Sequence, residues 1–434
     1  MPPMSLIALS LLLAAGDPNL ERTTWPSFPA DPAERIERDL ALIYTTDNIG
    51  PTVTFARLGY PGRILFRLHE DHPLLKVVIM STPATRYVQG RTLADSPEAA
   101  ATWKALATEP RFDWIELGGE GYTHSPPGDT NINHHEFSIR QSGCNLDHAR
   151  MGELDYCRER FRLAREAYRA AGIPDARVSL MRFPGIEDSP AALQAADEAG
   201  FLAILGGRHP EEPGRDWWIP HQGGGEILEI ENSNALKLFA RSAALEEGLR
   251  SGRIAPAGVR RSAEFAAAVA RGIERAEKAA ATGGILNLSD QWFETFAYIG
   301  DIMPRYLVLD AVLRAVEERY GPRVWYPRGR ELALWLDARR HAKVSWRVDG
   351  DGVQVEVDPP ARWARLAPEG LEAASLKVSL PARFGAVREV RIGEGGRASR
   401  VLDASRWWRA GDDIVIVFPL RAGVRLSVLH GAPP

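Results

Sequence analysis

Short apolar runs alternate with helical patterns through the first three quarters of the chain. Helical periodicity over residues 151–171 and 189–199 separates several of these runs. Parallel strands that helices cover on both faces must be apolar on both faces, as these runs are. The pattern therefore predicts an α/β domain over residues 36–340, with a barrel of seven parallel strands. The seven runs are residues 41–44, 74–80, 113–117, 178–181, 201–205, 227–230 and 284–288.

Two further segments of this domain have a helical pattern. Residues 237–281 are rich in Ala, Glu and Arg and predict two helices inserted before the last strand. Residues 333–340 predict a terminal helix that closes the domain.

After His341 the pattern changes to alternation of apolar and polar residues. Residues 343–357 alternate around an Asp-Gly pair, which is typical of a β-hairpin. Four more runs of this kind follow, at residues 375–380, 387–392, 413–418 and 424–429. Residues 341–434 therefore predict a small antiparallel β-sandwich.

The N-terminus carries an apolar run of signal-peptide length. Residues 5–16 are too short to cross a bilayer as a helix, and the small residues 14–16 suit a cleavage site. Residues 1–4 contain no Lys or Arg, so a buried strand or helix is the alternative. We interpret residues 1–16 as a signal peptide, residues 17–35 as a Pro-rich arm, and the protein as secreted or periplasmic.

Charge and cysteine usage narrow the possible partners. The formal net charge of −4 is spread along the chain, which argues against a nucleic-acid partner. No segment predicts stable membrane insertion, and nothing in the sequence indicates the oligomeric state.

Cys144 and Cys157 either pair in an exported protein, which would stabilise it by roughly 2–3 kcal/mol, or remain two inert thiols.

Polar residues stand where the predicted strands end. In parallel α/β barrels, functional side chains gather just past the carboxyl ends of the strands. Here those positions are residues 45–52, 118–126, 182–185 and 289–292, with residues 214–218 between the last two.

In this order, the strand ends resemble the motifs of the polysaccharide deacetylase (NodB-homology) family. That family has Thr-Phe-Asp-Asp-Gly-Pro, His-x-x-x-His, Arg-x-Pro-(Tyr/Phe)-Gly, an Asp-Trp element and Leu-His. The resemblance covers roughly residues 40–336 and excludes the C-terminal domain. It implies a distorted (β/α)7 barrel and hydrolytic removal of an acyl group from a carbohydrate.

The resemblance assigns catalytic roles to three residues. Asp47 matches the base that takes a proton from water, and Arg182 would hold it ionised through a charge-assisted pair. Asp216 matches the acidic residue that orients the arginine. A turn role is the alternative for Asp47, because Asp-Asn before Gly-Pro is common turn chemistry.

The metal ligands of the family are only partly present. Asn48 replaces the ligating Asp, Glu120 replaces the first His, and His124 is unchanged. The two replacements offset each other in charge, so the site could still bind a divalent cation. This cation could be zinc, or manganese or calcium because of the added oxygen ligand. In the alternative, Glu120 and His124 hydrogen-bond each other without a metal. No organic cofactor is implied.

The general acid of the family is missing. Ser289, followed by Asp290, stands where the family has the His that acts as general acid. Loss of a general acid typically costs about 10²–10⁴ in rate unless another group replaces it. His134, His135 and His221 are the candidate replacements, although adjacent histidines in a loop rich in Gly, Asn and Pro are more often surface residues. His69 and His72 precede the second strand, at the opposite end of the domain, and we interpret both as structural.

Aromatic residues crowd the same strand ends and suit the C–H faces of sugar rings, although many will be core residues. We expect Trp218 and Trp292 to contact the ligand. Together with Tyr122, Phe183, Ser289 and Asp290 they form the predicted substrate-binding set; Trp217 and Phe293 lie beside them.

The sequence thus supports three functional hypotheses. The first is a carbohydrate deacetylase-like hydrolase in which Asp47 activates water, with or without a metal. The second is a glycan-binding protein that has lost catalysis. The third is a hydrolase that acts on a C–N bond of another amide, such as a cyclic one.

Overall fold

The chain folds into two compact units in the computed structural model. The larger contains Arg38–Asp337 with Arg365–Ala367, and the smaller contains the N-terminal residues to Glu37, Ala338–Ala364 and Pro368–Pro434. The predicted signal peptide lies outside the described residues. These are 23–50, 62–85, 91–129, 131, 134–138, 148–186, 188–206, 216–231, 242–291, 297–349, 352–380, 386–394 and 398–430.

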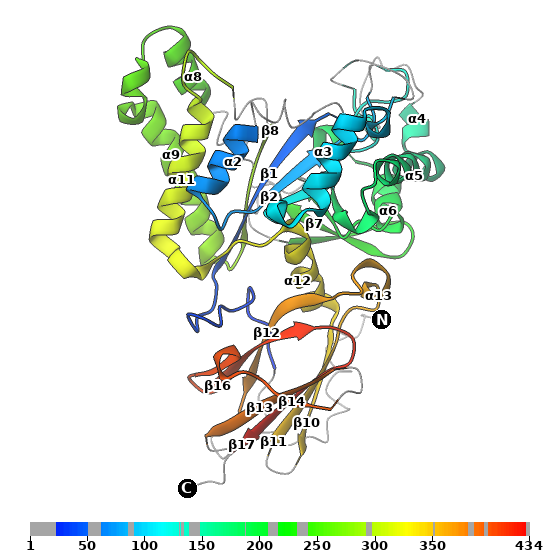
Figure 1. The fold of residues 1–434 in the computed structure, drawn as a ribbon, viewed down its shortest axis with the longest axis vertical. Helices are drawn as coiled ribbons and strands as arrows, with labels where there is room; N and C mark the ends of the chain where they lie inside the picture. Colours follow the sequence, from blue (N-terminus) through cyan, green and yellow to red (C-terminus); the bar gives the residue numbers. More distant parts are fainter. Residues whose placement is uncertain are drawn as a thin grey trace, which may run out of the picture. The chain divides into compact units, whose positions relative to one another are not determined.

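The larger unit is built on a nine-stranded sheet (Figure 1). Each of the seven predicted runs overlaps one parallel strand, so these strands are confirmed. β6 is antiparallel to β7, and β9 pairs with β1. The strands are β1 (Leu40–Ile49), β2 (Val77–Ser81), β3 (Ile115–Gly119), β4 (Val178–Met181), β5 (Ala203–Gly206), β6 (Asp216–Pro220), β7 (Glu226–Glu231), β8 (Ile285–Gln291) and β9 (Val324–Trp325).

The prediction of a closed barrel is not confirmed. Among the described strands the order is β6-β7-β5-β4-β3-β2-β1-β8, and no pairing joins β8 to the other end. β7 and β8 contact each other, so the sheet curves strongly without closing. The reason is local: β6 pairs with the outer edge of β7, which is the edge that closure would need.

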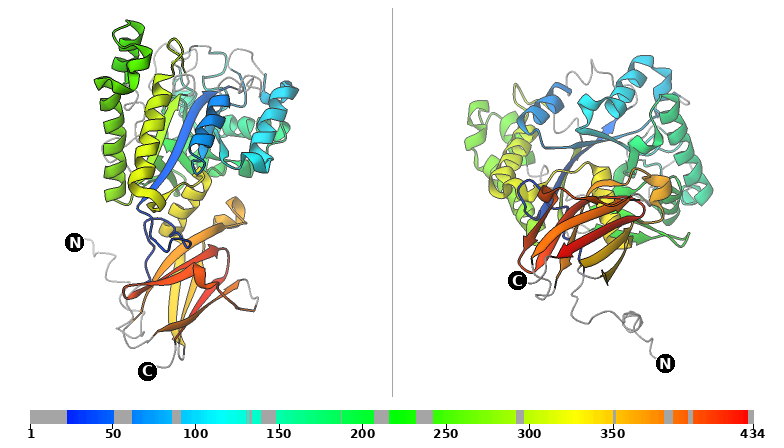
Figure 2. Two further views of the ribbon diagram at one scale, coloured as in Figure 1. Left: turned by 60° about the vertical axis from the view of Figure 1, so that its left-hand side comes forward. Right: turned by 60° about the horizontal axis from the view of Figure 1, so that its bottom comes forward.

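Helices flank this sheet (Figures 1 and 2). The two predicted inserted helices are α8 and α9, and the predicted terminal helix is α12. None of the described helices is both long and apolar enough to span a membrane. The α-helices of the described residues are α2 (Gly62–Asp71), α3 (Pro97–Thr108), α4 (His148–Met151), α5 (Leu154–Ala170), α6 (Pro190–Glu198), α8 (Ser242–Arg250), α9 (Ala263–Ala281), α11 (Pro304–Tyr320), α12 (Gly329–His341) and α13 (Trp363–Leu366).

Local chemistry fixes where two of these helices begin. The Ser189 hydroxyl accepts a hydrogen bond from Ala192 N at the start of α6, where Pro190 occupies the first turn. Ser262 caps α9 in the same way by accepting from Phe265 N. Such caps satisfy backbone donors that the helix itself leaves unpaired.

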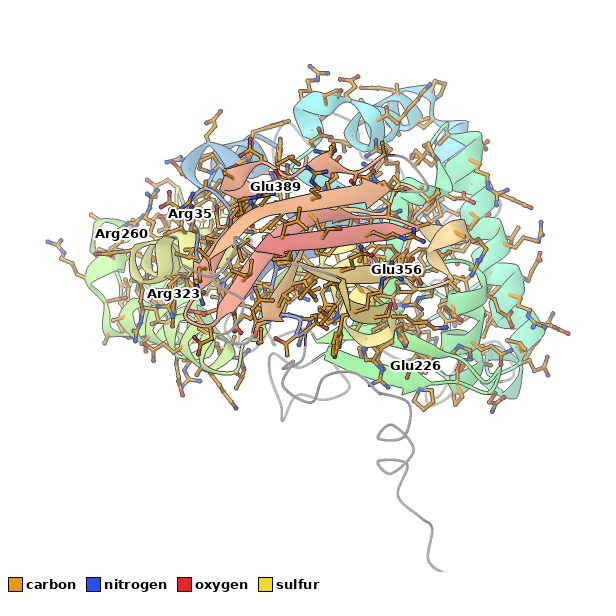
Figure 3. All side chains as sticks on the ribbon, turned by 90° about the horizontal axis from the view of Figure 1, so that it is seen from below. Arg35, Glu226, Arg260, Arg323, Glu356 and Glu389 are labelled. Carbon is orange, nitrogen blue, oxygen red and sulfur yellow. The ribbon has the colours of Figure 1, made fainter. Side chains whose placement is uncertain are left out.

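The smaller unit contains two antiparallel sheets. One has the order β10-β11-β17-β13-β14 and the other β12-β16-β15. Side chains from both sheets are shown in Figure 3, where Glu356 labels β11 and Glu389 labels β13. The strands are β10 (Lys343–Asp349), β11 (Gly352–Asp358), β12 (Leu371–Ser379), β13 (Val387–Glu394), β14 (Arg400–Val401), β15 (Trp407–Ala410), β16 (Asp413–Leu420) and β17 (Val424–His430).

The described part of the N-terminal arm belongs to the same unit. Thr24 forms a β-bridge with Lys377 on β12, and Ala30 N donates to the Ser375 hydroxyl at 2.8 Å. The Lys377 ammonium also pairs with Glu37 at 2.7 Å. These contacts hold the arm against the three-stranded sheet.

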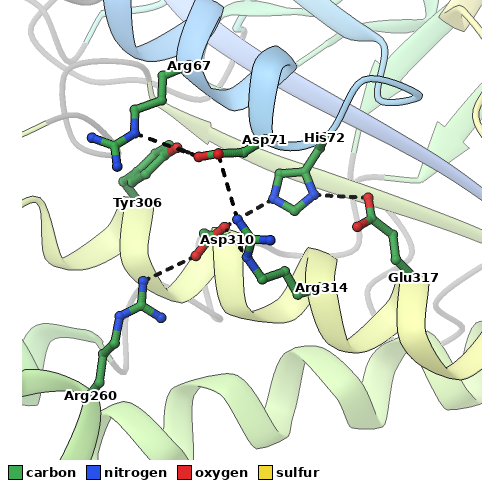
Figure 4. A network of polar contacts seen from close by, with 8 residues as sticks. All are labelled: Arg67, Asp71, His72, Arg260, Tyr306, Asp310, Arg314 and Glu317. Atoms are coloured by element: carbon green, nitrogen blue, oxygen red, sulfur yellow. Dashed lines mark hydrogen bonds and ion pairs between the residues drawn. The ribbon is translucent and has the colours of Figure 1, made fainter.

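A buried polar network joins α2 to α11 at the amino end of the parallel sheet (Figure 4). His72 is fully buried, and its ring nitrogens lie 3.2 Å from Asp310 and 2.9 Å from Glu317. Asp310 also accepts from Arg260 at 3.2 Å and Arg314 at 2.9 Å. The sequence-based interpretation of His72 as structural agrees with these contacts.

Replacement of His72 by Leu should lower the free energy of unfolding by about 2–4 kcal/mol, because two charge-assisted contacts are lost inside the protein. The matched control is Arg67→Leu, since Arg67 is exposed and lies 3.7 Å from Asp71. That variant should cost about 0–1 kcal/mol. Urea unfolding measures both, and equal losses would show that burial of His72 adds nothing.

Candidate active site

The strand register brings several predicted residues to the carboxyl end of the parallel sheet. Thr45 on β1 pairs with Ser289 on β8, and Asp47 pairs with Gln291. Side chains two apart on a strand share one face, so Thr45 and Asp47 point to the same side of the sheet. The predicted strand ends therefore meet around one region of the larger unit.

Arg182 and Asp47 form the central ion pair of this region. The Arg182 Nη1 atom lies 2.8 Å from the Asp47 carboxylate. Arg182 also donates to Thr45 Oγ1 at 2.9 Å and to the Leu205 carbonyl at 3.2 Å. The arginine side chain is 1% exposed, whereas that of Asp47 is 14% exposed. The buried Arg182 guanidinium, fixed by three acceptors, therefore holds the Asp47 carboxylate in one orientation, and this carboxylate keeps some access to solvent.

Asp216 occupies the same level of the sheet. It pairs with Ile230 on β7, which in turn pairs with Leu205 on β5, the residue whose carbonyl accepts from Arg182. The Asp216 side chain lies outside the described part of the structure, so its predicted contact with Arg182 stays a prediction.

Two residues that support the ion pair were not predicted. Thr45 accepts from Arg182 and donates its hydroxyl proton to Asn287 Oδ1 at 3.2 Å. Both Thr45 and Asn287 are fully buried. The period of two that places Thr45 beside Asp47 on one face was the signal that could have found it.

Glu120 and His124 lie together in the loop after β3. Glu120 Oε1 is 3.8 Å from His124 Nε2, which is too long for a hydrogen bond between them. The separation would allow both atoms to bind one cation at about 2.0–2.2 Å each. A protein site needs about three such ligands, however. Among the described side chains, no group of three His, Cys, Asp or Glu could hold a metal ion, and the Asn48 side chain is not among them.

Glu136 holds this loop in place, a role that the sequence analysis missed. Its side chain is fully buried, accepts from Tyr122 N at 2.7 Å and forms an ion pair with Arg160. Arg160 in turn donates to Thr123 Oγ1 at 2.6 Å and lies 4.7 Å from the centre of the Tyr122 ring. Glu136 N also donates to the carbonyl of His124 at 3.0 Å. In the sequence, the position of Glu136 directly after His134 and His135 was the feature that could have indicated its role.

Only one of the three candidate replacements for the general acid lies beside the site. His134 is buried, with its ring nitrogens engaged by Asp129 at 2.6 Å and Asn131 at 3.2 Å, so it is structural. His221 follows β6 directly. The last residue of β6 pairs with the first residue of β7, so His221 lies at the amino end of the parallel sheet. There it contacts Asp197 at 3.3 Å. Both interpretations as a replacement acid are therefore corrected.

His135 is the remaining candidate. Its ring centre lies 5.6 Å from that of His124 in an edge-to-face arrangement. The ring also lies directly against Gly185, in the turn that follows Arg182. His135 thus connects the loops after β3 and β4.

The absence of a side chain at Gly185 makes room for His135. Gly185 has φ +65°, and an added methyl would come within 2.0 Å of the His135 ring. Gly128 has φ +77° with nothing within 4 Å. Both Ala variants should lose about 1–2 kcal/mol from backbone strain, but Gly185→Ala should also displace His135. A thermal-unfolding comparison tests this, and equal changes in Tm would contradict it.

The predicted substrate-binding residues are not all exposed. Phe183 is 2% exposed and packs edge-to-face on Phe137, so its ring is part of the core, and its predicted contact with the ligand stays a prediction. Ser289 is buried as well. Tyr122 is half-buried, and burial raises the pKa of its phenol. Trp218 is half-buried on β6.

Other predicted positions fall outside the described side chains. Asp290 pairs with Thr46, but its side chain is not described, and neither is that of Trp217. Trp292 and Phe293 lie outside the described residues.

Cys157 is a free, buried thiol in this structure. Burial raises its pKa to about 12, so it stays protonated and unreactive at neutral pH. Cys144 lies outside the described residues. The contacts of Cys157 match the inert-thiol interpretation.

Comparisons with known proteins give distant similarities only. No protein-family model matches the chain, and no curated protein matches it. A solved structure of a putative polysaccharide deacetylase from Mycobacterium smegmatis is 17% identical, with 72% of this chain and 93% of that chain covered and a TM-score of 0.43. The similarity is distant.

Two other solved structures are more distant still. A 4-alpha-glucanotransferase from Thermococcus litoralis is 11% identical, with 66% of this chain and 39% of that chain covered and a TM-score of 0.39. The BpsB deacetylase domain from Bordetella bronchiseptica is 17% identical, with 40% and 64% covered and a TM-score of 0.25. None of these similarities assigns an activity to this chain.

Proposed function

We propose that this protein is a hydrolase that removes an acyl group, most simply acetyl, from a carbohydrate. The observation that carries the proposal is the Asp47 carboxylate, held at 2.8 Å by the buried Arg182 at the carboxyl end of a parallel sheet. The order of motifs along the chain gives independent support, because it matches the polysaccharide deacetylase pattern at Asp47, His124 and Arg182.

Asp47 acts as the base in this proposal. It takes a proton from water while the water oxygen attacks the carbonyl carbon of the acyl group. The C–N or C–O bond to the sugar then breaks, its electron pair stays on the sugar atom, and Asp47 returns the proton to that atom. Arg182 fixes the direction in which the carboxylate points, so the water it holds is aligned for attack.

A backbone N–H would stabilise the oxyanion that forms on the carbonyl oxygen. The Tyr122 N–H is unsuitable, because it already donates to Glu136 at 2.7 Å. The Phe183 N–H follows Arg182 directly, and among the described residues it has no acceptor. We assign the oxyanion contact to Phe183 N, where a preorganised donor is worth about 10²–10³ in kcat.

A divalent cation bound at Glu120 and His124 would polarise the carbonyl as a Lewis acid. The described side chains supply only these two ligands, one fewer than such a site requires. The steps proposed above therefore use the residues of the chain alone.

Acetate release tests the proposal. The full chain is incubated with acetylated chito- and xylo-oligosaccharides, which present N-acetyl and O-acetyl groups, and free acetate is measured enzymatically. Turnover by the parent protein is expected, with a rate lower by about 10²–10⁴ for Asp47→Asn. Tight glycan binding without any acetate release, at each metal supplement tried, would overturn the proposal.

A further inference from the structure

The smaller unit contains a cavity of about 260 Å³ where its two sheets are connected. Residues after β14, the edge of the five-stranded sheet, cross to β15, the edge of the three-stranded sheet. The crossing contains Leu402 and Arg406, and Pro419 and Arg421 at the end of β16 form the facing wall. The volume is below the usual 300–1,000 Å³ of ligand pockets, which suits one sugar residue rather than a larger molecule.

Positive charge dominates the walls of this cavity. Arg400, Arg406 and Arg421 line it, and all three are exposed. Among the described residues, Arg406 and Arg421 form no ion pair, and Arg400 reaches only Glu394 at 3.8 Å. Their charges are therefore available to an anionic ligand.

Other arginines of the five-stranded sheet behave differently. Arg425 pairs with Glu356 at 3.0 Å, and Arg391 pairs with Glu389; both glutamates are labelled in Figure 3. These two arginines are neutralised by carboxylates, whereas three guanidinium groups without a close carboxylate partner among the described side chains line the cavity.

Two acidic residues also line the cavity, and they restrict the kind of anion. The Asp403 carboxylate accepts from Ser405 N at 2.8 Å, so it is partly occupied within its own turn. Glu372 remains, on β12 next to the residue that pairs with Leu420. The Glu372 carboxylate lowers the net positive charge of the cavity, which weakens attraction of a dianion such as phosphate more than attraction of a monoanion. It could also accept a hydrogen bond from a sugar hydroxyl.

The distribution of charge along the chain is also compatible with an anionic sugar ligand. Residues 341–434 carry 14 Lys and Arg against 11 Asp and Glu, whereas the whole chain has a net charge of −4. The C-terminal residues therefore oppose an anionic polymer less than the remainder of the chain does.

We propose that this cavity binds the carboxylate of a uronic acid residue, which makes the smaller unit a binding module for acidic polysaccharides. Arginine forks match a carboxylate with two parallel hydrogen bonds. The buried Leu402 and the half-buried Pro419 give an apolar surface for the C–H face of the same sugar ring. This site goes beyond the proposed hydrolysis and does not depend on it.

Calorimetric titration of the full chain tests the proposal. The probes are a uronic acid oligosaccharide (oligogalacturonate), the same oligosaccharide after reduction of its carboxylates, and inorganic phosphate. The parent should bind the uronate at least about tenfold more tightly than the reduced form, as expected for the loss of a charge-assisted contact. Phosphate should not compete at equal concentration.

The variants locate the site. Arg406→Gln with Arg421→Gln should weaken uronate binding by at least about tenfold. The matched control is Arg388→Gln with Arg425→Gln, which removes the same net charge from exposed positions outside the cavity and should change affinity less than about twofold at 150 mM salt.

Three results would overturn the proposal: no binding of the uronate by the parent, equal binding of the reduced form, or equal losses in the two double variants. Competition by phosphate would assign the cavity to a different anion. Unfolding temperatures of both double variants establish that each remains folded. Acetate release is measured separately, so failure of either proposal leaves the other open to its own test.

Discussion

Replacement of Asp47 by Asn should lower kcat for acetate release by about 10²–10⁴ and leave the protein folded. The amide keeps the shape of the side chain and can still accept a hydrogen bond from Arg182, which lies 2.8 Å away. It cannot take a proton from water, so the first step of hydrolysis is lost. Because Asp47 positions water and not the sugar, KM should change little.

Steady-state kinetics on an acetylated oligosaccharide measure this effect, with thermal unfolding as a check on the fold. Asp197→Asn is the matched control, since Asp197 also faces a basic side chain, His221 at 3.3 Å, but at the amino end of the sheet. Its kcat should equal that of the parent. Similar losses in both variants would indicate a general effect of removing a carboxylate.

The second large effect is expected at Glu136. Glu136→Ala removes the partner of Arg160 in a pair whose side chains are 0% and 7% exposed. An uncompensated buried charge costs about 3–5 kcal/mol of unfolding free energy. The same change frees the backbone of Tyr122, so the loop that carries Glu120 and His124 should lose its fixed conformation.

A double variant separates the lost charge balance from the lost loop contacts. Glu136→Leu with Arg160→Met removes both charges and should recover about half or more of the stability, because apolar replacement of a whole buried pair is often near neutral. Acetate release should stay low, since the acceptor for Tyr122 N is still missing. Urea unfolding and kinetics report the two effects, and full recovery of activity would show that Glu136 has no positioning role.

The strands could be predicted from the sequence because each is apolar on both faces. The run at residues 178–181 shows this most clearly, since β4 has the same bounds. Closure could not be predicted, because it depends on which strand takes the free edge of β7. That strand is β6, which begins at Asp216 and ends at Pro220, two residue types that are depleted in strands.

The candidate site was predictable only where a motif named its residues. Asp47 and Arg182 are 135 residues apart and lie in contact. Thr45, Asn287 and Glu136 were missed because their role is to satisfy buried donors, and the need for such partners appears only once the chain is folded. The Phe183 ring was expected at the ligand from its motif alone, and its packing in the core becomes visible only in the folded chain.

A double-variant cycle on Asp47 and Arg182 tests the central claim most directly. Initial rates of acetate release are measured for the parent, Asp47→Asn, Arg182→Gln and the combined variant. If the pair works as one unit, the combined variant should be no slower than the slower single variant. Multiplied losses, or a parent-like rate for Asp47→Asn, would contradict the account.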